Sequence, residues 1–231
     1  AVLNLSVNAF VVEAQAGTRA SIPSGTPEQE TPEEKEIHDI WVFQYDAAAK
    51  ELLIKPRYYT ITDQAMLQDL PVYLKAGVPS VVYAVTNTGY DNWANDGTDA
   101  AWQKFRQLEQ LKKQTLPTAF PLRSIDKVSI PMAGASEEVE VTTGITVTVP
   151  VTRMYAKLKV KVEMRKAEMK LNNVNVRQIP NICRVETLAG DGNDEPMDAV
   201  PFPDGTTFGS IAFAASDLEK NEDKEWAVFY V

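Results

Sequence analysis

The sequence predicts a mostly β protein made of two tandem Greek-key β-sandwich domains with one main helix. The first observation behind this prediction is a pattern that occurs twice: a short alternating strand, a turn-rich or charged gap, and a second strand with an apolar core. Its two copies cover 2–10 with 37–46 and 153–162 with 171–177. The second observation is that one segment, 102–115, has the spacing of an amphipathic helix, whereas β-branched stretches separated by turns occupy much of the remaining chain.

The length of the chain and the place of Pro150 predict how it is divided. A chain of 231 residues with 44% apolar residues can supply a buried core to each of two modest domains. The two copies of the pattern lie on either side of Pro150, so we predict domains at 1–150 and 151–231. About 80 residues follow that boundary, fewer than the ~100 of a full sandwich, so the second domain is expected to be incomplete in this chain.

The composition argues against several classes of function. A net charge of −9 disfavours nucleic-acid binding, which depends on clustered lysine and arginine. No run approaches the roughly 18 apolar residues of a membrane span, and the N-terminal residues lack the blocks of a signal peptide, so we expect a soluble or already processed form. The one cysteine, Cys183, cannot form an internal disulfide, which leaves the redox compartment open.

The first element is a strand with one apolar face. Leu3, Leu5, Val7 and Ala9 alternate with asparagine and serine residues, which is the period of a half-buried strand. Removing such a strand from an antiparallel sandwich exposes unpaired backbone groups beside an apolar groove, and a strand from another chain can satisfy both. Segment 1–19 is therefore a candidate for strand exchange. The simpler alternative is that it is an ordinary first strand.

A long loop is expected at 17–36, which is rich in proline and acidic residues and cannot bury enough apolar surface to order itself. Because compact domains rarely hold structureless loops beyond about 12–15 residues, its length indicates a function such as access by a protease or a partner. Arg19, followed by the small Ala20, is the candidate processing site in this mobile loop. The alternative is that Arg19 is an ordinary loop arginine.

The next elements follow from apolar runs and turn signals. Residues 37–45 are apolar on both faces, which predicts a central strand, and 46–50 form a turn into a strand at 51–55 that 56–60 extends. Two more strands are expected at 72–74 and 79–87.

The main helix is predicted at 102–115, with Asp99 as its cap and Pro117 as its stop. Strands at 127–132 and 138–141 are expected to flank a turn at 133–136, and a further strand follows at 145–149. The second domain is predicted to contain strands near its two repeated segments and at 183–188, 207–213 and 225–231.

Five short segments follow one another in a characteristic order along nearly the whole chain. They are Thr18-Arg19-Ala20, the run Ile37 to Tyr45 around Asp39-Ile40-Trp41-Val42-Phe43, Pro56-Arg57-Tyr58-Tyr59, Ile130-Pro131-Met132-Ala133-Gly134 and Arg153-Met154-Tyr155-Ala156-Lys157. In this order and spacing they resemble the fimbrillins, the pilus subunits of Bacteroidales that are also called type V pilins. No one of the five segments is specific by itself.

The resemblance implies two transthyretin-like sandwich domains, export as a lipoprotein to the outer membrane and cell surface, and assembly after a protease cuts behind an arginine in the N-terminal loop. Arg19 is the residue that matches. The family's lipid-accepting cysteine and C-terminal donor strand are not found in this sequence, so stalk, tip and anchor roles all stay open. The expected partners are other fimbrial subunits and host or bacterial surface ligands, with membrane contact only through a lipid anchor.

No catalytic constellation is evident, and no enzyme activity, metal or cofactor is expected. His38 is the only histidine, and a couple with Cys183 would lack an orienting third group. The loops 91–97 and 191–195 hold oxygen donors but depart from the EF-hand order, so solvated turns are the default and calcium the alternative. Tyr90 with Trp93 is a candidate glycan platform, although such a pair more often anchors a loop.

The leading hypothesis is a cell-surface fimbrial subunit or fimbria-associated adhesin that assembles by β-strand donation after proteolysis near Arg19. The alternative is a surface carbohydrate-binding accessory lipoprotein on the same sandwich scaffold. An enzyme built from loop carboxylates is a third reading that no group of residues supports.

Overall fold

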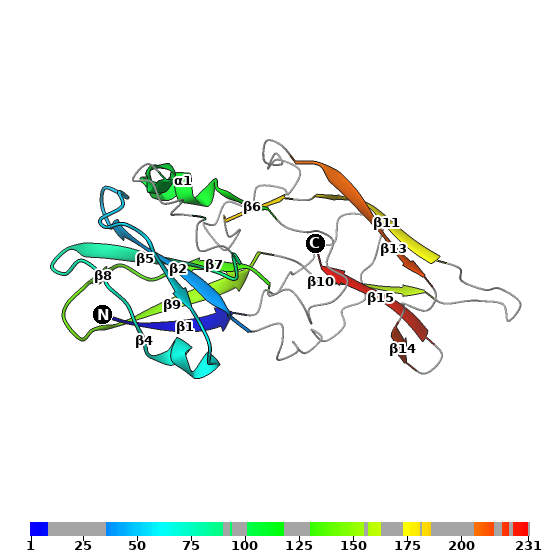
Figure 1. Ribbon diagram of the computed structural model, residues 1–231, viewed down its shortest axis with the longest axis horizontal. Helices are drawn as coiled ribbons and strands as arrows, with labels where there is room; N and C mark the ends of the chain where they lie inside the picture. Colours follow the sequence, from blue (N-terminus) through cyan, green and yellow to red (C-terminus); the bar gives the residue numbers. More distant parts are fainter. Residues whose placement is uncertain are drawn as a thin grey trace, which may run out of the picture. The chain divides into compact units, whose positions relative to one another are not determined.

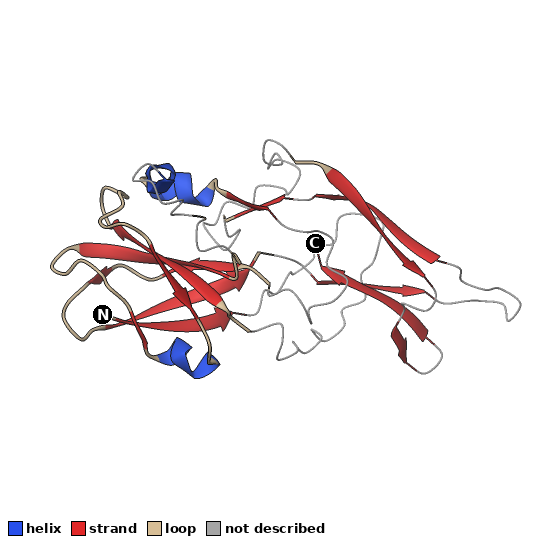
Figure 2. Ribbon diagram, viewed as in Figure 1, coloured by secondary structure: helices blue, strands red, loops and turns tan. Residues whose placement is uncertain are grey.

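Strands make up most of the regular structure in the part of the chain that the computed structural model describes (Figure 2). The described residues are 1–8, 36–89, 93, 101–117, 130–154, 157–162, 173–180, 182–185, 206–214, 219–221 and 224–230. The predicted mostly β class is confirmed.

Contacts within the chain group it into two compact units, each built from two separate segments. Unit 1 is Ala1–Gln107 with Ser129–Arg153, and unit 2 is Leu108–Val128 with Met154–Val231. The last passage from unit 1 to unit 2 lies after Arg153 rather than at Pro150, because strand β9 (Thr146–Arg153) continues through that proline. The limits 1–150 and 151–231, and the transthyretin-like sandwich form of each domain, stay predictions.

Unit 1 contains a curled sheet of eight strands in the order β3-β2-β5-β7-β9-β1-β4, with β8 paired to β5 (Figure 1). The other strands besides β9 are β1 (Val2–Asn8), β2 (Asp39–Asp46), β3 (Arg57–Thr60), β4 (Leu70–Pro71), β5 (Pro79–Thr86), β7 (Met132–Ala135) and β8 (Val139–Glu140). Every pairing in this sheet is antiparallel except that of β1 with β9, which is parallel.

Strand β2 is the central strand that the apolar run 37–45 predicts. It pairs with β3 on one side and with β5 on the other. Ile40 and Val42 belong to an aliphatic core, while Trp41 and Phe43, which alternate with them, belong to a cluster of aromatic rings. Because successive side chains of a strand point to opposite faces, burial on both faces explains why this run lacks polar alternation.

The aliphatic core of unit 1 joins residues from strands far apart in the sequence. Its members are Leu3, Ile37, Ile40, Val42, Ile61, Leu70, Val72, Val82, Ala84, Met132, Val147, Val149 and Val151. The aromatic cluster consists of Trp41, Phe43, Tyr45, Tyr58, Trp93 and Phe105. The buried Tyr45 hydroxyl donates a hydrogen bond of 2.9 Å to the Phe105 carbonyl, which satisfies the polar end of this ring.

The turn after β2 forms where it is predicted. Asp46 Oδ1 accepts hydrogen bonds from the backbone N–H groups of Ala48 at 2.9 Å and Ala49 at 2.7 Å. Beyond the turn, the strand predicted at 51–55 is reduced to isolated bridges, of which Tyr45 with Leu52 is one. The regular pairing with β2 resumes only at β3.

The predicted helix at 102–115 is wrong in its extent. The structure has a 3₁₀ helix at Ala101–Phe105, a short helix α1 at Leu108–Lys112 and strand β6 at Thr115–Pro117. Between the two helices the Arg106 carbonyl accepts a hydrogen bond of 2.8 Å from the Leu52 N–H, and Gln107 bridges to Glu51. The helix is interrupted because tertiary pairing with 51–52 engages the backbone there.

Two strand predictions in unit 1 are also corrected. Most of the predicted turn at 133–136 belongs to strand β7. Its small residues, which suggested a turn, instead allow β9 to approach closely. A Cβ atom added at Gly134 would collide with the carbonyl oxygen of Pro150. No strand forms at 72–74, where one is predicted; the strand in this region is β4, at Leu70–Pro71.

Unit 2 contains three separate sheets among its described residues. Strands β10 (Lys157–Val162), β15 (Lys224–Tyr230) and β14 (Glu219–Asn221) form the first; β11 (Asn173–Pro180) with β13 (Phe208–Ala214) and β6 with β12 (Ile182–Arg184) form the others. Most of the strands predicted in the second half of the chain are thus present. The two strands of the repeated pattern, β10 and β11, belong to different sheets.

Candidate functional site

Strand β1 has two unequal edges. One edge pairs in parallel with β9 along its whole length, from Val2 opposite Thr146 to Asn8 opposite Thr152. The other edge pairs with β4 at Val2 and Leu3 only, so among the described residues no strand covers that edge from Asn4 onward. Figure 1 shows β1 beside β9. A strand held along a single edge over most of its length has fewer backbone hydrogen bonds to lose than a central strand.

The predicted exchange residues are placed by this register. Leu3 is fully buried in the aliphatic core, as predicted for a residue of the apolar face. Leu5 stands opposite Val149 and Val7 opposite Val151 in the parallel ladder. Both valines are fully buried. The apolar positions of β1 are therefore paired with buried positions of β9.

The beginning of β1 is tied down by backbone hydrogen bonds. The Val2 N–H donates to the Ile145 carbonyl at 2.9 Å, and the Val72 N–H donates to the Ala1 carbonyl at 2.9 Å. These bonds link the strand to the residues that precede β9 and follow β4. Ala9, Arg19 and Ala20 lie outside the described residues, so the predicted end of the exchange segment and the processing site stay predictions.

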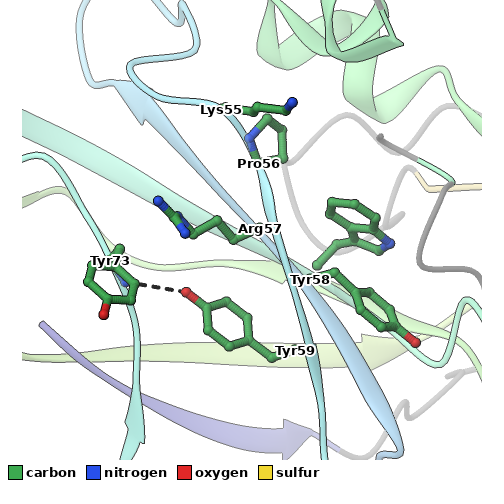
Figure 3. Close-up of a pocket in the computed structure, with 7 residues that line it drawn as sticks. Lys55, Pro56, Arg57, Tyr58, Tyr59 and Tyr73 are labelled. Carbon is green, nitrogen blue, oxygen red and sulfur yellow. Dashed lines mark hydrogen bonds between the residues drawn. The ribbon is translucent and has the colours of Figure 1, made fainter. Parts of the chain in front are cut away.

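A second feature of unit 1 is a pocket of about 390 Å³ at edge strand β3. It is lined by Trp41, Lys55, Pro56, Arg57, Tyr58, Tyr59 and Tyr73. Arg57 and Tyr59 lie on one side of the β3 chain and Tyr58 on the other, as strand alternation requires (Figure 3). The lining thus combines two cations with aromatic rings and includes no carboxylate.

Three contacts order this pocket, which we call the β3 pocket. The guanidinium carbon of Arg57 lies 4.8 Å from the centre of the Tyr73 ring, a cation–π distance. The Tyr73 N–H donates to the Tyr59 hydroxyl at 3.3 Å (Figure 3). The Trp41 and Tyr58 rings lie 5.3 Å apart. Burial raises the pKa of Tyr59, so its hydroxyl keeps its proton at neutral pH.

The sequence offered one signal for the β3 pocket, the run of two cations and two tyrosines from Lys55 to Tyr59. We interpreted Lys55 as the end of a strand at 51–55, and Pro56 to Tyr59 as its extension and as one of the segments of the fimbrillin resemblance. Tyr73 and Trp41 join it only through the fold, because β2 and the segment after β4 bring them beside β3.

Other residues singled out in the sequence are structural where the structure describes them. Trp93 is only 8% exposed and packs edge-on against Phe43 and Phe105, so it is part of the aromatic cluster and does not form a glycan platform. Tyr90 lies outside the described residues. His38 is exposed in unit 1 with Glu36 at 3.4 Å, whereas Cys183 belongs to β12 of unit 2.

The buried carboxylate Asp39 is accounted for by the fold. It accepts hydrogen bonds from the Thr88 N–H at 2.9 Å, the Thr88 hydroxyl at 3.0 Å and the Gly89 N–H at 2.9 Å. These bonds join the start of β2 to the end of β5. Within the described ranges, no cluster of three or more histidine, cysteine or acidic side chains could hold a metal ion.

Comparisons with known proteins find similar folds among solved structures. The tip fimbrial protein Mfa3 from Porphyromonas gingivalis, with C-terminal truncation, is 14% identical, with a TM-score of 0.47 over 85% of this chain and 64% of that chain. The fimbrial anchor protein Mfa2 from the same organism is 12% identical, with a TM-score of 0.47 over 100% of this chain and 73% of that chain.

A third structure, a fimbrial assembly protein from Parabacteroides distasonis, is 13% identical, with a TM-score of 0.46 over 85% of this chain and 70% of its own. These structures belong to the group of Bacteroidales fimbrial proteins that the sequence resembles. The chain spans 64% of the length of the truncated Mfa3 chain. No protein-family model matches the sequence, and no curated protein matches it.

The helices of the described residues are all too short or too polar to cross a membrane.

Proposed function

We propose that this protein is a non-enzymatic, fimbria-associated subunit of the cell surface in which β1 is a replaceable strand. After proteolysis behind Arg19, segment 1–19 would be exchanged for a strand supplied by another subunit. The partners are other fimbrial subunits, and the protein is exported to the outer membrane and tethered there by a lipid. The resemblance of the five ordered segments to fimbrillins supports the fimbrial role. The position of β1 in the sheet supports the strand-exchange mechanism.

The observation that carries this proposal is the separation of β1 from β2. The two strands are consecutive in the chain but are not neighbours in the sheet, since β1 pairs with β9 and β4 while β2 pairs with β3 and β5. Cutting the connection between Asn8 and Glu36 therefore breaks no hairpin. Once it is cut, β1 would be held by its ladder to β9, its short pairing with β4 and the buried side chain of Leu3.

The parallel pairing changes one part of the exchange hypothesis. We expected the strand to leave an antiparallel sandwich, whereas the edge of β9 that would be exposed accepts β1 in parallel. An incoming strand could use that edge in either direction, because both directions satisfy the backbone N–H and C=O groups. What must be matched is the apolar alternation of the sequence, which is in register with the buried valines of β9.

The test is an exchange assay on the cleaved protein. An Arg-specific protease would be used for limited digestion, and mass spectrometry is expected to find the first cut after Arg19. A fluorescent peptide copying residues 1–10 is then expected to enter the cleaved protein and displace 1–19, but not to enter the intact protein. A peptide with asparagine at Leu3, Leu5 and Val7 serves as the matched control and is expected to stay free.

Two results would contradict the proposal. Protection of Arg19 while arginines of the described strands are cut would remove the processing step. Equal uptake of the apolar and the asparagine-substituted peptide would show that the apolar face of the strand does not direct its binding. The alternative role, a carbohydrate-binding accessory protein on the same scaffold, requires neither cleavage nor exchange.

A further inference from the structure

The β3 pocket concentrates positive charge in an acidic protein. The chain has a net charge of −9, yet the two ionised side chains that line this pocket are both cations, Lys55 and Arg57. The ion pairs found among the described residues join other groups, Glu36 with His38 and Glu109 with Lys112. In the described part of the chain, no carboxylate neutralises the two pocket cations, so the pocket favours an anion.

The cation–π contact of Arg57 leaves its hydrogen-bond donors available. The guanidinium is planar, and its central carbon lies over the Tyr73 ring, 4.8 Å from the ring centre. Its N–H groups project from the edge of that plane, where they can bind both oxygens of a carboxylate. The contact with Tyr73 also limits the rotamers of a long side chain, so less conformational entropy is lost when an anion binds.

The aromatic residues offer a surface for an apolar ring face. Tyr73 is 69% exposed, more than any other large hydrophobic residue described. The Tyr59 hydroxyl accepts the Tyr73 N–H at 3.3 Å and still has its own proton to donate. A simple anion such as phosphate could use the cations and this donor, but it would leave the exposed ring without a partner.

We propose that the β3 pocket binds a carboxylate-bearing sugar, a uronate unit of an acidic glycan. Arg57 binds the carboxylate, Lys55 adds positive charge to the pocket, Tyr73 packs against the C–H face of the sugar ring, and the Tyr59 hydroxyl donates to a sugar oxygen (Figure 3). The pocket volume of about 390 Å³ is near the lower end of the range for small-molecule sites, roughly 300–1,000 Å³, and suits one or two sugar rings. Since the whole chain is acidic, it repels long polyanions and favours a single or terminal acidic unit.

The residues of this site lie on β2, on β3 and its preceding segment, and after β4 rather than on β1. Because Ala1 is hydrogen-bonded to Val72, next to Tyr73, sugar binding is measured on the uncleaved chain, in which β1 stays in place. A failure of sugar binding there would leave the result of the exchange assay unaffected. Either role considered for the protein, fimbrial adhesin or carbohydrate-binding accessory protein, would use such a pocket.

The test uses isothermal titration calorimetry of the full chain with digalacturonate, and with its dimethyl ester as the neutral analogue. Digalacturonate is expected to bind, and the ester at least about tenfold more weakly, because the charge-assisted hydrogen bonds are lost. The double variant Lys55→Gln with Arg57→Gln is expected to lose at least about tenfold in affinity. Its matched control is Lys50→Gln with Arg106→Gln, which removes the same charge from exposed positions of unit 1 outside the pocket.

A second variant tests the Tyr73 ring, which offers a face to the sugar and also orients Arg57. Tyr73→Ala removes an exposed ring and is expected to weaken digalacturonate binding at least about tenfold while the thermal unfolding temperature stays within a few degrees. The proposal is overturned if the unmodified protein does not bind digalacturonate, or if the control pair reduces affinity as much as the pocket pair. Equal binding of the dimethyl ester, or equal competition by acetate and inorganic phosphate, would also overturn it.

Discussion

Replacing Leu3 with alanine is expected to weaken both the folded protein and the hold of unit 1 on the cleaved strand. Leu3 is fully buried and belongs to the aliphatic core together with Leu70 and Val147, which lie on the two strands that flank β1. It is also the one predicted exchange residue whose side chain the structure describes. Truncation at this position removes apolar contacts from β1 without altering its backbone ladder to β9.

The expected magnitude follows from the complete burial of this side chain. A leucine-to-alanine change in a packed core costs about 2–5 kcal/mol, with the spread set by how far the cavity collapses. Because Leu3 lies between two flanking strands and is part of a core shared by many strands, we expect about 3 kcal/mol. At about 1.4 kcal/mol per factor of ten, this corresponds to a 100- to 200-fold change in the equilibrium for strand release.

Two measurements and one control variant test this prediction. Urea unfolding of the intact chain gives the loss of stability, and the rate at which labelled 1–19 leaves the cleaved protein gives the loss of strand binding. Leu53→Ala is the matched control, since Leu53 is partly exposed and lies outside the aliphatic core. It is expected to cost less than about 1 kcal/mol and to leave strand release unchanged. A Leu3→Ala effect no larger than that of the control would refute the assigned role of Leu3.

Three further outcomes are expected. Gly134→Ala should destabilise unit 1 by about 3 kcal/mol in urea unfolding, because the new Cβ collides with the Pro150 carbonyl and moves β9, whereas Gly77→Ala meets no atom and should be limited to backbone strain. Asp39→Asn should cost about 1–3 kcal/mol by the same assay, because an amide NH₂ would replace one of the two carboxylate oxygens that accept hydrogen bonds from Thr88 and Gly89. A loss below about 0.5 kcal/mol would contradict this account. Burial raises the pKa of Tyr45 above its usual 10.0, so the contribution of Tyr45 to stability is complete below about pH 10 and is lost as the pH rises further. Tyr45→Phe should cost about 1–2 kcal/mol at pH 7 and flatten the alkaline part of the curve of stability against pH. An unchanged curve would speak against this account.

The sequence determined the class of the fold and the positions of many strands. Alternation at Leu3, Leu5 and Val7 and the two-sided apolar run at 37–45 both became strands, because each pattern has one stable arrangement when its apolar faces are buried. The turn at Asp46 was equally local, since its side chain bonds to backbone groups only two and three residues away. Local patterns of this kind need no knowledge of distant partners.

Partner choice and element limits were decided by the tertiary structure. The parallel pairing of β1 with β9 joins residues separated by most of the chain, and no local pattern indicates its direction. The helix predicted at 102–115 is interrupted because Leu52 and Glu51 engage the backbone of Arg106 and Gln107. The small residues around Gly134 form a strand because β9 approaches too closely for a side chain at that position.

Of the two candidate sites, one could be found from the sequence and the other only from the tertiary structure. The exchange segment was visible in the sequence because its apolar residues follow one another along a single strand. The β3 pocket was not, because Trp41, Arg57 and Tyr73 come from three separate segments that meet only when β3 pairs with β2 and the chain after β4 lies beside it. A run of residues records its own periodicity, whereas a pocket depends on which strands become neighbours, and that choice is made by burial across the whole sheet.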